Sequence, residues 1–159
     1  MSEKKEMLKT VAENAFGRCD RVLKDLTEKE IEWRPVPESN NIRWILNHLS
    51  RQWNISIPRM IKGDPNYTPA DWPDDYANSN PSLQKLMSDL EKGKAAVLSG
   101  IDALSPVDLD AEIDLGRGGR KRLLMILAYL LEAVHHEGQI AMFRGNIRRR
   151  REKDKTFLV

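Results

Sequence analysis

Three histidines and one glutamate are the residues of this 159-residue chain whose types and spacing could bind a metal ion. His135 and His136 lie in the run LLEAVHHEGQ, and Glu132 precedes His136 by four residues. Residues four apart share one face of a helix, so Glu132 and His136 project together, whereas His135 is rotated from His136 by about 100°. The third histidine, His48, lies far upstream in WILNHLSRQW, among apolar residues that indicate an inward-facing helical position.

We therefore predict that His48, Glu132 and His136 converge between two helices and bind one divalent cation. Two neutral imidazoles and a carboxylate suit Zn²⁺, Ni²⁺ or Fe²⁺, and three protein ligands leave a position for water. The metal would lower the pKa of that water or hold an incoming nucleophile. Two simpler interpretations stay open: three unrelated histidines, or a Glu132–His136 ion pair that compensates a carboxylate on an inward face.

Further residues stand near these ligands in the sequence. Gln139 could hydrogen-bond to a ligating side chain, or it could be an ordinary solvated glutamine. A glycine within a helix costs about 1 kcal/mol relative to alanine, so Gly138 indicates either a close backbone approach or a tolerated defect. Four side chains are pocket candidates, although each could equally serve ordinary packing: Trp44, Gln52, Trp72 and Tyr76.

Four helical segments must position these side chains. Apolar residues recur at steps of three and four, as is typical of amphipathic helices, over residues 7–26, 42–62, 81–104 and 120–148. Thr27 and Glu30 predict a capping box that starts a short turn, and Pro58 predicts a kink or an early end in the second segment. No strand pattern of comparable length occurs. The predicted fold class is therefore all-α, a four-helix bundle.

The connection between the second and third segments decides the topology. Residues 63–81 are rich in proline, glycine, asparagine and aspartate, which is typical of a loop. Such a loop could extend to roughly 60 Å, about twice the length of a twenty-residue helix. It permits a long crossover that leaves the two helices parallel. Tyr67, Trp72 and Tyr76 on this loop indicate packing over one end of the bundle, where a pocket could lie.

Composition limits the classes of partner. Hydrophobic residues make up 40% of the chain and charged residues 31%, and the net charge of +2 does not by itself indicate a polyanion partner. Basic residues gather at the C-terminus, so we divide the chain into a bundle, residues 1–148, and a basic tail, residues 149–159. The tail could bind nucleic acid, but it has no interleaved aromatic residues for base stacking. Arginines there would also offset the helix dipole or simply be solvated.

The single cysteine and the N-terminus indicate the cellular compartment. Cys19 excludes an intramolecular disulfide and a cysteine-based zinc cluster, and it falls on the apolar stripe of the first segment. No apolar stretch approaches the ~20 residues that span a bilayer. The opening MSEKKEMLKT has no apolar signal core. We expect a cytoplasmic protein with no membrane partner.

Two stretches of the chain resemble the DinB/YfiT-like superfamily of metalloenzymes. Residues 26–53 contain the elements W-R-P-x-P and I-x-W-I-L-x-H-L, and residues 123–146 contain H-x-G-Q-I. With compatible helices between them, the resemblance spans nearly the whole chain. It implies a four-helix bundle with a long connection between helices two and three, and a histidine triad for a divalent metal, often nickel or zinc. Position by position, His48 and His136 match the triad, and Glu132 stands where the family usually has histidine.

The resemblance also implies a class of activity. It points to a metal-dependent enzyme with a small-molecule substrate, either a hydrolase or a thiol-dependent S-transferase that uses a low-molecular-weight thiol such as bacillithiol or mycothiol. A maleylpyruvate isomerase is among the relatives, and homodimers are common. Because Glu132 replaces a histidine, an alternative is a non-catalytic DinB-like dimer that serves as a binding module. Nucleic-acid binding through the basic tail is the other alternative, and we do not expect it.

Overall fold

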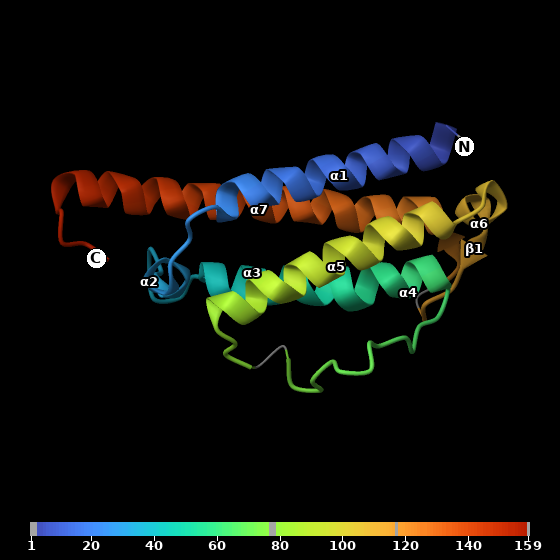
Figure 1. Cartoon of the computed structure of the whole chain (residues 1–159), viewed down its shortest axis with the longest axis horizontal. Coiled ribbons are helices and arrows are strands. Elements are labelled where there is room, and N and C mark those ends of the chain that lie inside the picture. The colour runs from blue at the N-terminus through green and yellow to red at the C-terminus, as the bar shows by residue number, and fades with distance from the viewer. Residues whose placement is uncertain (1–2, 77–78, 117, 159) are drawn as a thin grey trace.

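A computed structural model describes residues 3–76, 79–116 and 118–158 of the chain. The helices that build its bundle (Figure 1) are α1 (Glu3–Leu23), α3 (Ile42–Arg51), the π-helical turn η1 (Gln52–Ser56), α4 (Ile57–Lys62), α5 (Leu83–Ala103) and α7 (Arg122–Lys153). Shorter elements join them: α2 (Glu28–Glu32), α6 (Pro106–Asp110) and the antiparallel strands β1 (Glu112–Ile113) and β2 (Arg120–Lys121). Because α3, η1 and α4 follow one another without a break, they form one of four helical rods. The predicted all-α four-helix bundle is confirmed.

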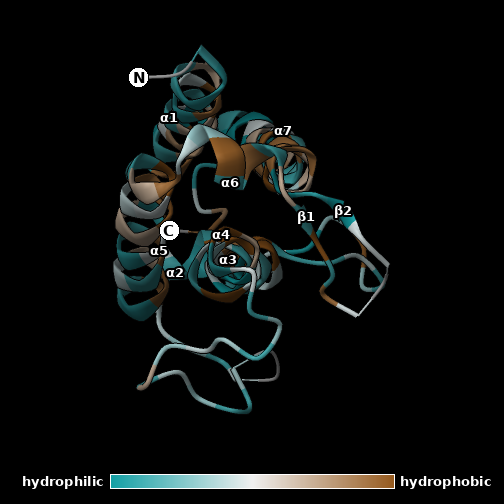
Figure 2. Cartoon of the chain, turned by 90° about the vertical axis from the view of Figure 1, so that its right-hand side faces the viewer, coloured by the Kyte–Doolittle hydropathy of each residue, from teal (hydrophilic) through white to brown (hydrophobic). Residues whose placement is uncertain are grey.

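The rods are joined by a crossover, as the sequence predicts. In Figure 1, the α3–η1–α4 rod and α5 run in the same direction, and residues 63–76 and 79–82 of the connection lie along the outside of the bundle. Helices α1 and α7 run in the opposite direction to this pair. Figure 2 looks along the bundle and shows α7 next to α1, with α3 and α4 on its other side and the β1–β2 hairpin alongside. Side chains of α3 and α7 can therefore meet.

Apolar side chains from all four rods form one core. Phe16 packs edge-on against Trp53, with ring centroids 4.7 Å apart. Cys19 is fully buried, as its place in the apolar stripe predicts, and burial raises the pKa of its thiol to about 12. No helix in the described part of the chain is long and apolar enough to cross a membrane. Other fully buried core residues include Leu8, Ile45, Leu49, Leu90, Ile101, Ile126 and Ile140.

The second rod passes through a proline without ending. Of the two outcomes predicted for Pro58, the early end does not occur, because the helix continues to Lys62 as the apolar pattern predicts. Before the proline, the backbone widens into η1, where the N–H of Ile57 donates to the carbonyl of Gln52, five residues back. Since proline lacks an N–H, a helix must rearrange its hydrogen bonds around it, and a π turn is one way to do so. The turn begins at Gln52, one of the pocket candidates.

Two mid-helix glycines have opposite surroundings. A Cβ atom at Gly93 of α5 would lie 2.7 Å from Cβ of Trp53, so α5 approaches η1 as closely as it does only because this position is glycine. A Cβ at Gly138 of α7 would meet no other atom of the described residues within 4 Å. Of the two interpretations of Gly138, a close backbone approach is therefore not found among the described residues, and such an approach occurs at Gly93.

The C-terminal end of α7 packs against α2. The helix continues to Lys153, beyond the predicted end near residue 148, and the predicted capping box of α2 is present. Its Glu30 carboxylate is buried and accepts a hydrogen bond from Arg151 at 2.8 Å. The guanidinium of Arg150 lies 5.3 Å from the ring centroid of Trp33. These basic residues bind partners in their own chain, which leaves fewer charges for a polyanion.

Candidate metal centre

The three predicted metal ligands lie together between α3 and α7. His48, Glu132 and His136 each offer one ligand atom, and these atoms are all within 4.8 Å of one another. The two imidazole rings have centroids 4.8 Å apart and are inclined at 70°. Oε2 of Glu132 lies 3.8 Å from Nε2 of His48. Helical spacing therefore identified the pair on α7, and the packing of α3 against α7 adds the third residue.

Gln139 orients the ring of His136. Its Oε1 lies 2.9 Å from Nδ1 of His136, which places the ring hydrogen on Nδ1 and leaves the lone pair of Nε2 free. Nε2 of Gln139 is 3.1 Å from Nε2 of His135, so the amide is held on both sides. A contact of this kind fixes the tautomer of a ligating histidine. His135 is exposed and lies outside the three-residue group, but it contacts the residue that orients His136.

Gln52 places its amide nitrogen between the other two ligands. This nitrogen is 2.9 Å from Nε2 of His48 and also donates to Oε2 of Glu132. Its own Oε1 is buried and has no hydrogen-bond partner among the residues that the structure describes. His48 and Glu132 thus both direct acceptor lone pairs at the amide NH₂ group of Gln52, which carries a partial positive charge. A divalent cation would satisfy the same lone pairs, so the donor set fits a metal ion.

The charge states of the cluster also suit a metal. Burial lowers the pKa of His48, and the neighbouring His136 lowers it further, while Glu132 acts in the opposite direction. His48 is therefore neutral near pH 7, which is the form that binds metals. The side chain of Glu132 is 51% exposed. The expectation that its carboxylate needs a partner because it faces inward is wrong, since water can solvate it.

Trp44 forms one wall of the cluster. It precedes His48 by one helical turn, and its indole stacks on that imidazole with centroids 5.4 Å apart and planes 5° apart. The same ring meets His136 edge-on at 6.4 Å. Trp44 is nevertheless 44% exposed. A large aromatic side chain at the surface beside two histidines is suited to contact a ligand that enters from solvent.

The structure places Trp72 and Tyr76 away from the histidines. Tyr76 is buried, and its hydroxyl lies 2.8 Å from Oγ of Ser50 and 2.8 Å from Oδ2 of Asp89. Trp72 packs on the tyrosine ring with centroids 4.2 Å apart. Ser50 is two residues from His48, so the two side chains leave α3 in different directions. The crossover loop therefore packs along the side of the bundle and does not cover its end (Figure 1).

A cavity of about 810 Å³ adjoins the cluster, and Glu132 forms part of its wall. Most of its lining could not be predicted from the sequence. Arg51 follows His48 by three residues, so helical spacing could have identified it, whereas no local pattern joins the hairpin to α4. The other residues in this wall include Arg59, Met60, Leu115, Arg120, Lys121, Leu124, Met125, Ala128 and Tyr129.

Comparisons with known proteins agree with this architecture. The model of one family, described as the DinB superfamily, matches residues 13–140. Among solved structures, the chain is similar to the crystal structure of a conserved protein from Enterococcus faecalis, with 20% sequence identity and a TM-score of 0.67. The similarity covers 91% of this chain and 96% of that protein, and at this identity it shows the fold alone. No curated protein matches the sequence significantly.

Proposed function

The chain belongs to the DinB superfamily, and we propose that it is a metal-dependent enzyme in which His48, Glu132 and His136 bind one divalent cation. One observation carries the proposal: three ligand atoms from two helices lie within 4.8 Å of one another. Two imidazoles and one carboxylate suit Zn²⁺, Ni²⁺ or Fe²⁺. The orientation of His136 by Gln139 supports the same assignment, because ligating histidines are commonly held through their second nitrogen.

A divalent cation at this position supplies Lewis acidity, which lowers the pKa of a water molecule or of a thiol. The residues around the cation position its ligands. Gln139 keeps Nε2 of His136 free, and Gln52 satisfies the lone pairs of His48 and Glu132 that a cation would take over. With one carboxylate and two neutral rings, the ligands carry one negative charge. A divalent cation held by His48, Glu132 and His136 would therefore keep a net positive charge, which would favour an anionic nucleophile beside it.

We propose that the nucleophile is water, in a hydrolase, or a low-molecular-weight thiol, in an S-transferase. Both reactions need a small electrophilic substrate and the same activation, so the cluster supports both. The exposure of Glu132 and Trp44 supports access from solvent for either nucleophile. Turnover of model esters with water, compared with consumption of an electrophile only when a thiol is present, separates the two reactions.

Metal content tests the proposal directly. We expect protein that is purified without chelators, or reconstituted with Zn²⁺, Ni²⁺ or Fe²⁺, to hold about one ion per chain by elemental analysis. Glu132→Ala and His136→Ala are expected to lose most of it, because each removes one of three ligands. The matched control is His135→Ala, which alters the adjacent histidine and keeps the three ligands. Wild-type protein that binds none of these metals would overturn the proposal.

The second candidate function is a non-catalytic DinB-like homodimer that serves as a binding module. The observation in its favour is Glu132, which stands where the resemblance leads us to expect a third histidine. Unchanged metal content in His48→Ala would favour this candidate. For the dimer itself, α7 offers exposed apolar side chains, and sedimentation equilibrium measures the association. These side chains are Leu124, Leu131 and Met142.

A further inference from the structure

We propose that the cavity beside Glu132 binds a small organic anion, a carboxylate or a phosphate ester with an apolar body. The proposal names the substrate class for the metal centre, and in that respect it rests on the proposed function. The cavity has a volume of about 810 Å³, within the range of pockets that bind small molecules. Its wall combines cationic and apolar side chains, and each kind recognises one part of such a ligand.

Four cationic side chains line the cavity, against the single carboxylate of Glu132. None of the four forms an ion pair within the described residues, although many other cations of the chain do. The acids next to the hairpin form no ion pair with them among the described residues: Asp110 binds Lys4 at 2.6 Å and attracts Lys121 only at longer range, and Glu112 stands opposite Lys121 in the strand pairing without an ion pair. An anion between these cations would relieve their mutual repulsion. The four are Arg51, Arg59, Arg120 and Lys121.

The cations come from two sides of the cavity. Arg51 and Arg59 belong to the α3–η1–α4 rod, and Arg120 and Lys121 form β2. The backbone of the crossover loop holds Arg59 in place, because Nε of Arg59 donates a hydrogen bond to the carbonyl of Tyr67 at 2.7 Å. Its guanidinium keeps further N–H groups for a ligand. Arginine forks bind carboxylates and phosphates through two hydrogen bonds, which is why both anions belong to the proposal.

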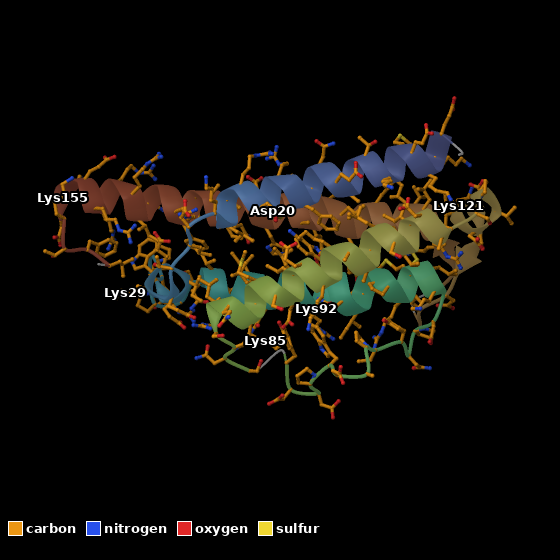
Figure 3. All side chains as sticks on the ribbon, in the orientation of Figure 1. Asp20, Lys29, Lys85, Lys92, Lys121 and Lys155 are labelled. Carbon is orange, nitrogen blue, oxygen red and sulfur yellow. The ribbon has the colours of Figure 1, made fainter. Side chains whose placement is uncertain are left out.

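The apolar wall lies on α7 and runs toward the metal centre. From Leu124 to Glu132 the helix rises by about 12 Å, which sets the scale of the ligand. Figure 3 shows Lys121 at the end of the bundle where the hairpin lies, whereas Glu132 belongs to the histidine cluster farther along α7. A ligand in the cavity would therefore reach the cluster with one end while β2 binds the other. Apolar contacts along the wall come from Leu124, Met125, Ala128 and the ring of Tyr129.

Matched probes test the charge of the ligand. The probes are 2-naphthoate, 2-naphthyl phosphate and the neutral 2-naphthamide, titrated calorimetrically into the metal-loaded protein at low and high salt. We expect both anions, or one of them, to bind at least tenfold more tightly than the amide, and to weaken with salt. The carboxylate and phosphate arms show which anion the site prefers. Equal binding of amide and anions, or no binding of any probe, would overturn the proposal.

Matched variants locate the site. Arg59→Gln and Arg120→Gln, one from each side, should each weaken anion binding about tenfold and leave the amide unchanged. Lys92→Gln is the control, because it removes one exposed positive charge from α5, away from the hairpin (Figure 3). Equal losses in this control would show that only net charge matters, and the proposal would fail. Circular dichroism confirms that each variant is folded.

The same titrations separate this proposal from the metal proposal. Protein stripped with a chelator keeps the cavity cations, so anion binding that still depends on Arg59 would support the proposal even if no metal binds. The opposite result is one bound metal ion per chain with no preference for anions. In that case the metal centre stands, and the inference about the ligand is wrong.

Discussion

Helix α3 carries polar clusters on two sides, and they differ in whether their hydrogen bonds are complete. Toward α5, the Tyr76 hydroxyl joins Ser50 and Asp89, and Lys85 binds the Asp89 carboxylate at 2.5 Å. Asp89 is only 3% exposed, so its carboxylate is shielded from water, and Lys85 reaches it from a half-exposed position. Toward α7, the histidine cluster gathers acceptors around one glutamine amide, and its carboxylate is half exposed.

The difference distinguishes a structural network from the proposed binding site. A buried carboxylate that has donors in its own chain holds the crossover loop to the bundle, and any added ligand would compete with bonds already made. A cluster that has surplus acceptors and access to solvent gains stability only when a cation arrives. Burial alone does not indicate function, because the more deeply buried cluster of this protein is the structural one.

The largest expected effect that tests this comparison is stabilisation by metal. A metal ion at a thousand times its dissociation constant should raise the free energy of unfolding by about 4 kcal/mol, because it binds only the folded chain. Urea titrations with and without Zn²⁺ measure the change. The gain should vanish in His136→Ala and persist in Tyr76→Phe. If His136→Ala were stabilised as much as the wild type, the metal would be bound elsewhere.

Tyr76→Phe should break the closed network. The substitution leaves Ser50 and Asp89 without the hydroxyl and should lower the free energy of unfolding by about 1–3 kcal/mol. Metal affinity should not change, because the hydroxyl lies on the other side of α3. Tyr67→Phe is the control, since the hydroxyl of Tyr67 has no hydrogen bond in the described parts of the loop. Equal losses in both variants would contradict the assignment of a structural role to this network.

Much of the fold could be predicted because the patterns that define it are local. The steps of apolar residues marked the rods, and the length of the connection to α5 indicated a crossover. The turn η1 was missed, because a π turn adds one residue without disturbing a hydropathy pattern. The two-residue strands beside the GRGG link were missed because a segment of this length has no recognisable period.

The site was predictable only as far as helical spacing extends. Glu132 and His136 share a face of one helix, and His48 follows from the inward side of another. Trp72 and Tyr76 were wrongly predicted to lie near them, because the composition of a long loop does not determine its path. The cations of the cavity could not be predicted for a related reason, because only tertiary packing brings β2 close to α4. The proximity of His48, Glu132 and His136 is therefore the part of the site that the sequence predicted best, and their role as metal ligands stays a prediction.

Gln139→Leu should weaken metal binding about tenfold, because the ring of His136 loses the acceptor that fixes its tautomer. Competition with a chromophoric chelator measures the affinity. The free energy of unfolding of the metal-free protein should change little, which distinguishes this role from that of Tyr76. Gln84→Leu, at an exposed position of α5, is the matched control. An unchanged affinity in Gln139→Leu would show that His136 is oriented by other means.

His135→Ala should have the smallest effect, a two- to threefold loss of metal affinity. His135 contacts the cluster through the amide of Gln139 and through the edge of the His136 ring, with centroids 5.2 Å apart, and water can replace an exposed hydrogen bond at little cost. In the Gln139→Leu background, His135→Ala should cause a smaller loss than in the wild type, since the hydrogen bond is already removed and only the ring contact with His136 remains. Chelator competition on the two single variants and the double variant completes a double-mutant cycle, which measures the coupling between His135 and Gln139. A loss in His135→Ala as large as that in His136→Ala would make His135 a ligand, and the open cluster would then have a different composition.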